Sequence, residues 1–468
     1  MLRNRMPEIE IPQEAPFLND KLGRKDYADA FSTLVKHYSS TGCVIALNGE
    51  WGSGKTTFVK MFMQKMENEG GHPLYFNAWE NDYVSDPFIA LLSEIKDRFP
   101  GSDNWDNVIS SGCKILTSMA VAAGKNILKN KLGIDSDAVS AGFDEAGDLL
   151  KKDLDDYANY KTSFAEFRNA LEEYIVNKGN SDYPIVFFID ELDRCNPHFA
   201  VKVLERIKHL FDIPNIVFVL SLNKQQLEFA IQGYYGSPKI DATNYLRRFI
   251  DIEFSLPSPN VEEFCDYLYD TYNFDSFFDG EGRKNNSEFQ SYKDNFQRFS
   301  KILVSSSGLD LRTTDKIFAH SRLAMTGFIN NSKIFTDVFF LICYLRVSNP
   351  QLYQKLYNRE LSPQVILNEL EDYLPRVLLE IDDYKNERRQ ITYTIASLVY
   401  MYSINEDSES KGIFIISNGS KSVSLQCKLM DQKTFDEAIA WSAGHQKRFP
   451  LSYLLDRVEL LQSIRRLS

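Results

Sequence analysis

The stretch Gly49-Glu50-Trp51-Gly52-Ser53-Gly54-Lys55-Thr56 decides the fold of this chain, because it matches the phosphate-loop pattern G-x-x-x-x-G-K-[ST]. The apolar residues 43–47 before it predict a short buried strand, and residues 57–63 after it predict a helix. In that arrangement, backbone N–H groups and a helix N-terminus surround an anionic phosphate group. A glycine-rich turn with a chance lysine is the alternative interpretation, but the flanking strand and helix argue against it.

The loop predicts a binding site for ATP and Mg²⁺. Its glycines allow the backbone to approach the phosphates closely. We expect Lys55 to reach the β- and γ-phosphates and the Thr56 hydroxyl to ligate Mg²⁺. The residues of this stretch that are expected to bind nucleotide are Gly49, Glu50, Trp51, Gly52, Ser53, Gly54, Lys55, Thr56 and Thr57.

A second apolar stretch supplies the carboxylates that such a site needs. Residues 184–189 predict a fully buried strand, and Asp190 and Glu191 follow at its end. Asp190 is expected to hold Mg²⁺ through its water shell, and Glu191 to polarise the attacking water. A strand followed by an ordinary charged turn is the alternative, which the upstream phosphate loop disfavours.

Three further polar residues are candidates for catalysis. Asn223 follows the predicted strand 216–221, where it could contact the lytic water or the γ-phosphate as a sensor, or could cap the next helix. Arg247 and Arg248 precede the predicted strand 250–254. One of them could stabilise the transferred phosphoryl group across a subunit contact, or both could be solvated residues at a helix end. The sequence leaves both pairs of alternatives open.

Composition restricts the class of protein. The 468 residues are 43% apolar and carry a net charge of −12, from 53 basic and 65 acidic residues. That charge disfavours broad nonspecific nucleic-acid binding, although a local basic patch would still allow it. Six scattered cysteines without a C-x-x-C pair predict reduced thiols in a cytoplasmic protein. The sequence shows no signal-peptide core and no uninterrupted apolar run of about 18 residues, so we expect no membrane span.

The order of predicted elements indicates an α/β domain followed by a helical region. Residues 1–19 predict a loose lead-in. Residues 20–256 predict a P-loop NTPase domain, in which strands separated by helices form a parallel sheet covered by helices on both faces. We expect its first helix to open at Asp20. The remainder, 257–468, predicts a helical lid and interaction domain.

Within the helical region the pattern gives more specific expectations. Helices are predicted at 333–347 and 362–370. A hairpin is predicted at 412–429, with Asn418-Gly419 at its turn, because Asn-Gly favours the two-residue turns that join antiparallel strands.

Residues 100–165 interrupt the α/β pattern as an insertion. Val108–Gly124 within it is mildly apolar and is interrupted by Lys114. We favour a packed or interface helix over a membrane hairpin, because so short a segment with an internal charge spans a bilayer poorly. Asp135–Asp156 is acidic and is expected to be exposed.

The order of these motifs resembles that of the KAP family of P-loop NTPases, within the AAA+/STAND-like class. The resemblance covers about residues 20–330, and the lead-in 20–28 is similar as well. Four stretches carry it: Gly49–Thr56 is similar to G-x-W-G-S-G-K-[ST], Phe76–Trp79 to F-N-A-W, Asp190–Cys195 to D-D-L-D-R-C, and Tyr245-Leu246 with the strand ending at Pro257 to Y-L-x-K…P.

Two departures from the family pattern bear on function. Glu191 stands where the family often has Asp, which keeps a carboxylate base. Many family members carry transmembrane helices between the two motifs, where this chain has its insertion. Leu311-Arg312 resembles the start of the family's C-terminal helical segment, which implies that Arg312 contacts the nucleotide as a second sensor.

The resemblance implies an ATP-hydrolysing switch or motor that self-associates, acts with a partner effector protein and serves prokaryotic defence against phage. The alternative is a nucleotide-gated scaffold with little hydrolysis, whose output is partner binding. A nucleotide kinase would need an acceptor pocket that the sequence does not indicate. The six histidines show no spacing typical of a zinc or nuclease site.

Overall fold

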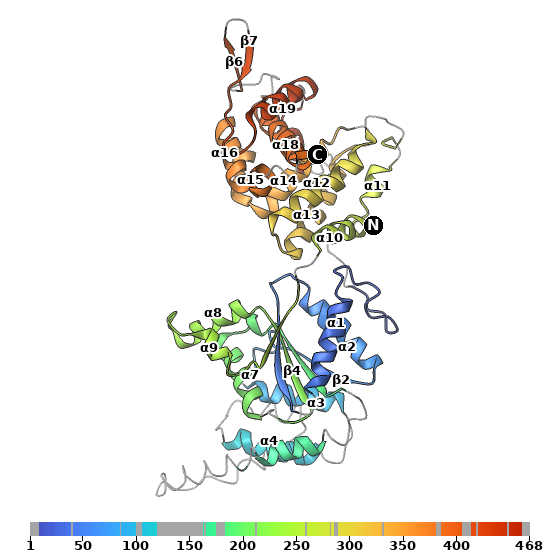
Figure 1. Ribbon diagram of the computed structural model, residues 1–468, viewed down its shortest axis with the longest axis vertical. Helices are drawn as coiled ribbons and strands as arrows, with labels where there is room; N and C mark the ends of the chain where they lie inside the picture. The colour runs from blue at the N-terminus through green and yellow to red at the C-terminus, as the bar shows by residue number, and fades with distance from the viewer. Residues whose placement is uncertain are drawn as a thin grey trace, which may run out of the picture. The chain divides into compact units, whose positions relative to one another are not determined.

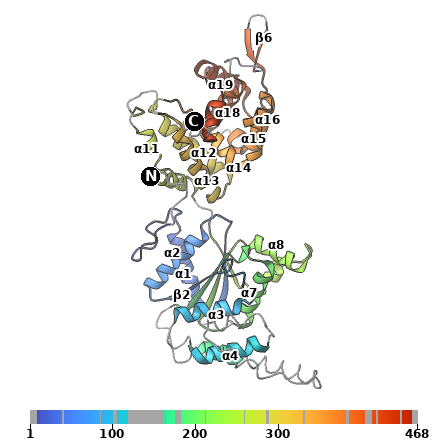
Figure 2. The same ribbon diagram turned by 180° about the vertical axis from the view of Figure 1, so that it is seen from behind.

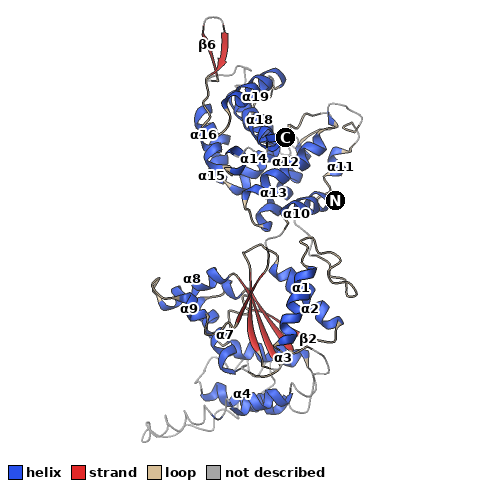
Figure 3. Cartoon of the chain, viewed as in Figure 1, coloured by secondary structure: helices blue, strands red, loops and turns tan. Residues whose placement is uncertain are grey.

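A parallel sheet of five strands carries the phosphate loop in this computed structural model (Figure 1, and red in Figure 3). The strand order is β2-β3-β4-β1-β5, and every neighbouring pair is parallel. The strands are β1 Cys43–Asn48, β2 His72–Asn77, β3 Ile185–Asp190, β4 Ile216–Leu222 and β5 Ile252–Ser255. The structure describes residues 9–38, 41–84, 86–99, 105–118, 162, 165–174, 183–210, 213–257, 260–280, 282–284, 289–329, 332–380, 385–404, 413–417, 420–446 and 449–460.

Side chains of the strands alternate between two hydrophobic clusters, one on each face of the sheet. On β3, Ile185, Phe187 and Ile189 belong to one cluster, and Val186 and Phe188 to the other. Burial on both faces explains why this strand is a continuous apolar run rather than an alternating one. The expected parallel sheet covered by helices is therefore confirmed (Figures 1 and 2): α1 (Lys25–His37) and α2 (Lys55–Asn68) cover the Phe188 face, and α3 (Pro87–Arg98), α7 (Pro197–Leu210) and α8 (Lys224–Tyr235) cover the other.

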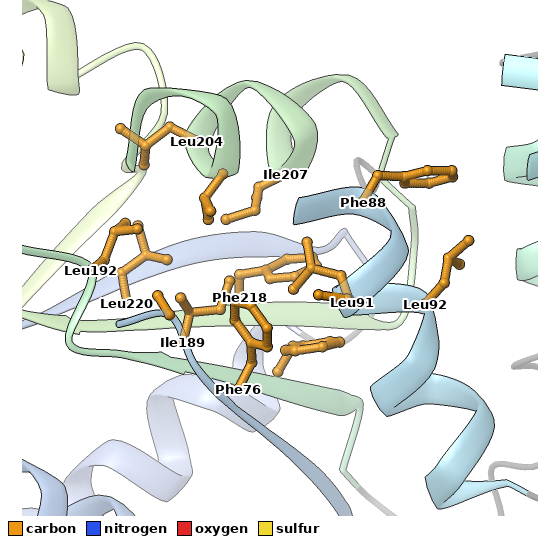
Figure 4. Packing of buried hydrophobic residues seen from close by; sticks show 14 of the residues in the cluster. Phe76, Phe88, Leu91, Leu92, Ile189, Leu192, Leu204, Ile207, Phe218 and Leu220 are labelled. Atoms are coloured by element: carbon orange, nitrogen blue, oxygen red, sulfur yellow. The ribbon is translucent and has the colours of Figure 1, made fainter. Parts of the chain in front are cut away.

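The cluster under α3 and α7 holds the ends of two strands in place. Figure 4 shows Phe76 of β2 and Ile189 of β3 packed with Phe218 of β4 beneath side chains of the two helices. Phe76 and Ile189 each lie one residue before a polar side chain, Asn77 and Asp190 respectively. Because a close-packed core transmits small shifts, this cluster fixes where those polar groups emerge.

The insertion contributes a helix that packs on the α/β unit. Helix α4 spans Trp105–Ser118, and its Val108 and Ile115 are buried in the same cluster as α3. Lys114 forms an ion pair with Glu166 at 2.7 Å. Residues 119–124, and the acidic stretch predicted to be exposed, lie outside the described residues. Within the described parts of the chain, no helix has the length and apolar character that crossing a bilayer requires.

The chain divides into two compact units at residues 258–259. The first, Ile9–Ser258, contains the sheet, and it includes Phe17, whose ring packs edge-on against Phe58 of α2. The second contains Pro259–Ser468 and is built mainly of helices. Its elements are α10 Val261–Thr271, α11 Asp275–Phe278, α12 Tyr292–Ser307, α13 Leu311–Ala324, η4 Met325–Gly327, α14 Thr336–Ser348, α15 Pro350–Asn358, α16 Pro363–Tyr373, α17 Val377–Glu380, α18 Lys385–Ser403, β6 Phe414–Ser417, β7 Ser420–Val423, α19 Gln432–His445 and α20 Ser452–Val458.

Some element bounds differ from the sequence expectation for local reasons. Helix α1 begins at Lys25 rather than Asp20, because the Asp20 carboxylate accepts the backbone N–H groups of Leu22 and Arg24 and so holds a turn. Helix α14 begins at Thr336 rather than Lys333, because Phe335 has a left-handed backbone with φ of 47°.

The second unit also contains one unexpected helix and one expected hairpin. Helix α15 was not predicted; Asn349 caps it by accepting the N–H of Leu352. The predicted hairpin is present as β6 and β7, paired antiparallel from Ser417 and Ser420, and its turn residues lie outside the described residues.

Candidate functional site

The stretch Gly49–Thr56 forms the turn between β1 and α2. Gly52 and Gly54 have φ of 74° and 84°, a left-handed backbone that residues with side chains rarely adopt. A Cβ on Gly49 would lie 3.0 Å from the Ser53 Oγ. The conformation of the loop therefore depends on its glycines. Because these residues have no side chain, the backbone at these positions can approach a bound anion directly.

Lys55 and Ser53 show that the loop fits an anionic group. Lys55 is 9% exposed, and its Nζ donates to the carbonyls of Gly49 at 2.6 Å and Glu50 at 2.9 Å. Burial lowers the pKa of Lys55, although the carboxylates of Asp193 and Asp190 oppose that shift. The Ser53 hydroxyl is buried and has no hydrogen-bond partner among the described residues. A phosphate oxygen would supply acceptors for both groups.

Asp190 joins the two motifs directly. It is buried at the end of β3, and its Oδ2 accepts a hydrogen bond from the Thr56 Oγ1 at 2.7 Å. The Tyr75 hydroxyl of β2 donates to the same oxygen at 3.2 Å, and burial beside Asp190 raises the pKa of Tyr75. A hydroxyl and a carboxylate this close can share one hard cation.

Glu191 is held by two side chains in a strained position. Its backbone φ is 60°, which is uncommon for a residue with a side chain. One carboxylate oxygen accepts a hydrogen bond from Asn77 Nδ2 at 3.2 Å, and the other forms an ion pair with Arg194. Arg194 belongs to the short helix η2 (Leu192–Arg194) directly after the strand. Local strain of this kind concentrates at functional sites.

Asp193 ties the phosphate loop to the end of β3. Its Oδ2 accepts hydrogen bonds from Trp51 Nε1 at 2.5 Å and from the backbone N–H of Asn223 at 2.9 Å. Trp51 is therefore a structural link within the loop, although its ring remains partly exposed.

Asn223 caps the following helix, which is one of the two roles expected for it, and it also contacts the phosphate loop. Its side-chain oxygen accepts the N–H of Gln226 at 3.2 Å as the N-cap of α8, and its Nδ2 donates to Glu50 at 3.0 Å. Because the same amide group also belongs to the hydrogen-bond network of the loop, the sensor role remains open and stays a prediction.

The remaining predicted site residues are Arg247, Arg248, Thr57 and Arg312. Arg247 and Arg248 are exposed after α9 (Ala242–Leu246), and Arg248 lines a cavity with Cys43 at the start of β1. That is the opposite end of β1 from the phosphate loop, so Arg248 lies away from the loop of its own chain. Thr57 lies half-buried in the first turn of α2. Arg312 is exposed on α13 in the other unit, and its role stays a prediction.

Arg24 is a site neighbour that the sequence did not reveal. Its Nη1 lies 3.5 Å from where a Cβ on Gly54 would be, and its Nη2 donates to the Pro257 carbonyl at 3.3 Å. The Nε and Nη1 atoms have no hydrogen-bond partner in the described part of the chain. Burial lowers the pKa of Arg24 to about 10, against the opposing charge of Asp20.

Asn77, Tyr75 and Arg194 were also missed as site residues. A signal for Asn77 was available, since parallel neighbouring strands end at the same edge of a sheet, and Asn77 pairs in register with Asp190. Among the described residues, no group of three His, Cys, Asp or Glu side chains could hold a metal alone. Thr56 and Asp190 fit Mg²⁺, which usually takes one or two protein ligands plus phosphate and water.

Comparisons with known proteins agree with this geometry. A model of the KAP family P-loop domain matches residues 24–405. The Phage T7 exclusion protein of Escherichia coli (strain K12) is 21% identical over 233 residues, which are 47% of this chain and 30% of that protein. The chain thus spans less than a third of that relative's length.

Two solved structures of the Aeropyrum pernix ORC2 protein are also similar. The ADPNP-ADP complexes give a TM-score of 0.35 at 12% identity, covering 100% of this chain and 99% of that one. The ADP form gives 0.36 at 11% identity, covering 94% and 97%. Scores this low support no argument about this chain. The family match, in contrast, covers well over half of the sequence and both halves of the nucleotide site, and the chain belongs to the KAP family of P-loop NTPases.

Proposed function

We propose that this protein binds Mg-ATP in the loop Gly49–Thr56 and hydrolyses it, as a switch or motor that acts with partner proteins. The observation that carries the proposal is the 2.7 Å hydrogen bond between Thr56 Oγ1 and Asp190 Oδ2. It places the end of the phosphate loop and the end of the carboxylate strand at one point, which is where a nucleotide-bound cation would need both.

Each residue of the site then has a defined task. Lys55 would exchange its two backbone carbonyl partners for phosphate oxygens, which are stronger acceptors because they are charged. Thr56 and Asp190 would hold Mg²⁺, which supplies charge neutralisation on the phosphates when bound. Glu191 would accept the proton of the attacking water.

The contacts of Glu191 suggest how turnover would be controlled. Both of its carboxylate oxygens are engaged, one by Asn77 and the other by Arg194. A carboxylate whose oxygens already accept hydrogen bonds has fewer positions left to orient the attacking water. Hydrolysis would therefore accelerate when Arg194 finds another partner, such as a phosphate oxygen or a neighbouring subunit.

A role in defence against phage rests on two similarities. The motifs resemble a family whose prokaryotic members often serve such defence, and the chain is similar to part of the Phage T7 exclusion protein. Self-association would give the exposed Arg247 and Arg248 a phosphate loop on another copy to act on. A partner effector protein would supply any activity against the phage.

The second candidate function is a nucleotide-gated scaffold with little hydrolysis. The ion pair between Arg194 and Glu191 favours it, because a base that remains so engaged would leave ATP bound and intact. The two functions differ in steady-state turnover, while both require nucleotide binding.

The test is the substitution Glu191→Gln in the full-length protein, with Glu80→Gln as the control. Glu80 is an exposed carboxylate three residues beyond Asn77. We expect Glu191→Gln to keep ATP bound and to lower turnover by about 10²–10⁴-fold, with the control unchanged. ATP turnover of each variant is measured with the protein alone and with DNA, RNA or candidate partner proteins added. If the wild-type protein turns over ATP no faster than Glu191→Gln under every condition, this result would contradict hydrolysis and favour the scaffold function.

A further inference from the structure

The helical unit contains a cavity unrelated to the phosphate loop. It has a volume of about 620 Å³ and lies among α12, α14, α18 and α19. Cavities that bind small molecules in proteins range from about 300 to 1,000 Å³. Its lining residues range in exposure from a buried amide to exposed aromatic and arginine side chains, and this order of exposure indicates the kind of ligand.

The buried end presents hydrogen-bond acceptors. Gln446 is 2% exposed and lines the cavity, and its Oε1 has no donor among the described residues. Asp337, also in the lining, accepts hydrogen bonds from Gln390 Nε2 at 2.9 Å and Thr336 Oγ1 at 3.1 Å. A carboxylate offers about four acceptor positions, so two remain.

These two acceptors come from segments that lie together. The Phe335 ring packs on that of Phe449 with centroids 5.0 Å apart, which brings the start of α14 beside the residues after α19. Burial raises the pKa of Asp337, whereas its hydrogen bonds lower it. An acceptor left without a donor in a buried site is destabilising, and a ligand with N–H groups would supply the missing donor.

The walls present aromatic rings. Tyr393 and Trp441 both line the cavity; their rings meet edge-on with centroids 6.1 Å apart, and His445 stacks on one side of the Trp441 ring with centroids 4.6 Å apart. Trp441 remains 45% exposed, which is unusual for so large an apolar side chain. A planar ligand such as a nucleobase could stack on one of these rings and meet the edge of the other.

The mouth presents two cations. Arg298 and Arg389 are exposed members of the lining. Arg298 donates to Asn295 at 3.3 Å and Arg389 to the Tyr393 hydroxyl at 3.4 Å. A guanidinium has five N–H donors, so both side chains keep donors for an anion.

From this order we propose that the cavity binds a guanine nucleotide as a second ligand, separate from ATP. The guanine base is planar and carries adjacent N–H donors on one edge, which match the two remaining acceptor positions of Asp337 and the unused oxygen of Gln446. Its phosphate would lie between Arg298 and Arg389. Adenine presents a single amino group and would leave an acceptor unpaired, which is the basis of the selectivity.

The test uses the full-length protein with Lys55→Ala, which removes the lysine of the phosphate loop. Calorimetric titration with GMP, AMP and CMP is expected to show GMP binding at least about tenfold more tightly than the other two. Guanosine should bind more weakly than GMP, because it lacks the anion. Equal affinities for the three nucleotides, or no GMP binding at about 1 mM, would overturn the proposal.

Two further variants localise the site. Asp337→Asn should lower GMP affinity at least about tenfold, whereas Asp372→Asn, which alters an exposed carboxylate on α16, should not. Arg389→Gln, an exposed change that leaves the core intact, should weaken GMP but not guanosine. GMP binding that is unchanged by both Asp337→Asn and Arg389→Gln would place the ligand elsewhere and refute the inference. None of these outcomes depends on ATP hydrolysis.

Discussion

Replacing Asp86 with alanine should destabilise the nucleotide-binding unit by about 3–5 kcal/mol, because it breaks a buried ion pair between the two helices over the site's core. Arg206 of α7 donates from Nε to Asp86 Oδ1 at 3.1 Å and from Nη2 to Oδ2 at 2.7 Å. Asp86 is 3% exposed, and its Oδ1 also accepts the N–H of Phe88 as the N-cap of α3.

The destabilisation predicted for Asp86→Ala has two contributions. Losing the cap alone costs about 1 kcal/mol. The larger part comes from losing the two charge-assisted hydrogen bonds that the buried Asp86 carboxylate accepts from Arg206. Asp86→Asn keeps the capping oxygen but loses the charge, so it should be less harmful than alanine by about 1 kcal/mol. For a unit of this size, 3–5 kcal/mol corresponds to a decrease in Tm of roughly 6–20 °C.

Scanning calorimetry of the full-length protein measures this change, with hydrogen exchange of α3 and α7 peptides assigning the transition. Arg98→Met is the matched control, because Arg98 forms an exposed ion pair with Glu67 worth about 0–1 kcal/mol. The double variant Asp86→Asn/Arg206→Met should recover part of the loss, since the charge of Arg206 is removed together with that of Asp86. A decrease in Tm for Asp86→Ala no larger than that for Arg98→Met would refute this reasoning.

Three other predictions concern the nucleotide and pH. Lys55→Ala should abolish tight Mg-ATP binding in isothermal titration, and unchanged affinity would remove Lys55 from the site. If an arginine acts across a subunit contact, the Arg247→Ala/Arg248→Ala variant alone should lose about 10³–10⁵-fold in ATPase activity. Mixing it with Lys55→Ala subunits should then restore activity. No rescue, together with activity independent of protein concentration, would contradict this role. Burial and the nearby Arg346 lower the pKa of His320 to about 4. Because the unfolded chain then binds the proton more readily, the helical unit should lose up to about 3 kcal/mol of stability as pH falls from about 6.5 to 4. Chemical denaturation across that pH range should show a weaker pH dependence of the free energy of unfolding for His320→Gln than for the wild type. An equal pH dependence in the two proteins would count against a neutral His320 in the folded unit.

The sequence by itself determined the phosphate loop, the carboxylate strand and the parallel sheet that joins them. Each of these is encoded locally: glycines at Gly52 and Gly54 permit the left-handed turn, and an unbroken apolar run from Ile185 marks a strand buried on both faces. Local patterns also indicated α16 and the hairpin of β6 and β7, because caps and turn residues act over a few positions.

Only the tertiary structure decided which side chains complete the site. Asn77 reaches Glu191 across 114 positions and Trp51 reaches Asp193 across 142, and both contacts depend on which strands lie side by side. Arg24 is a buried cation because two positions distant in the chain, Gly54 of the phosphate loop and Pro257, lie against its guanidinium. Periodicity specifies the conformation of a segment, but contacts between distant segments form only when the sheet assembles, and those contacts set the charge and hydrogen bonding around the carboxylates.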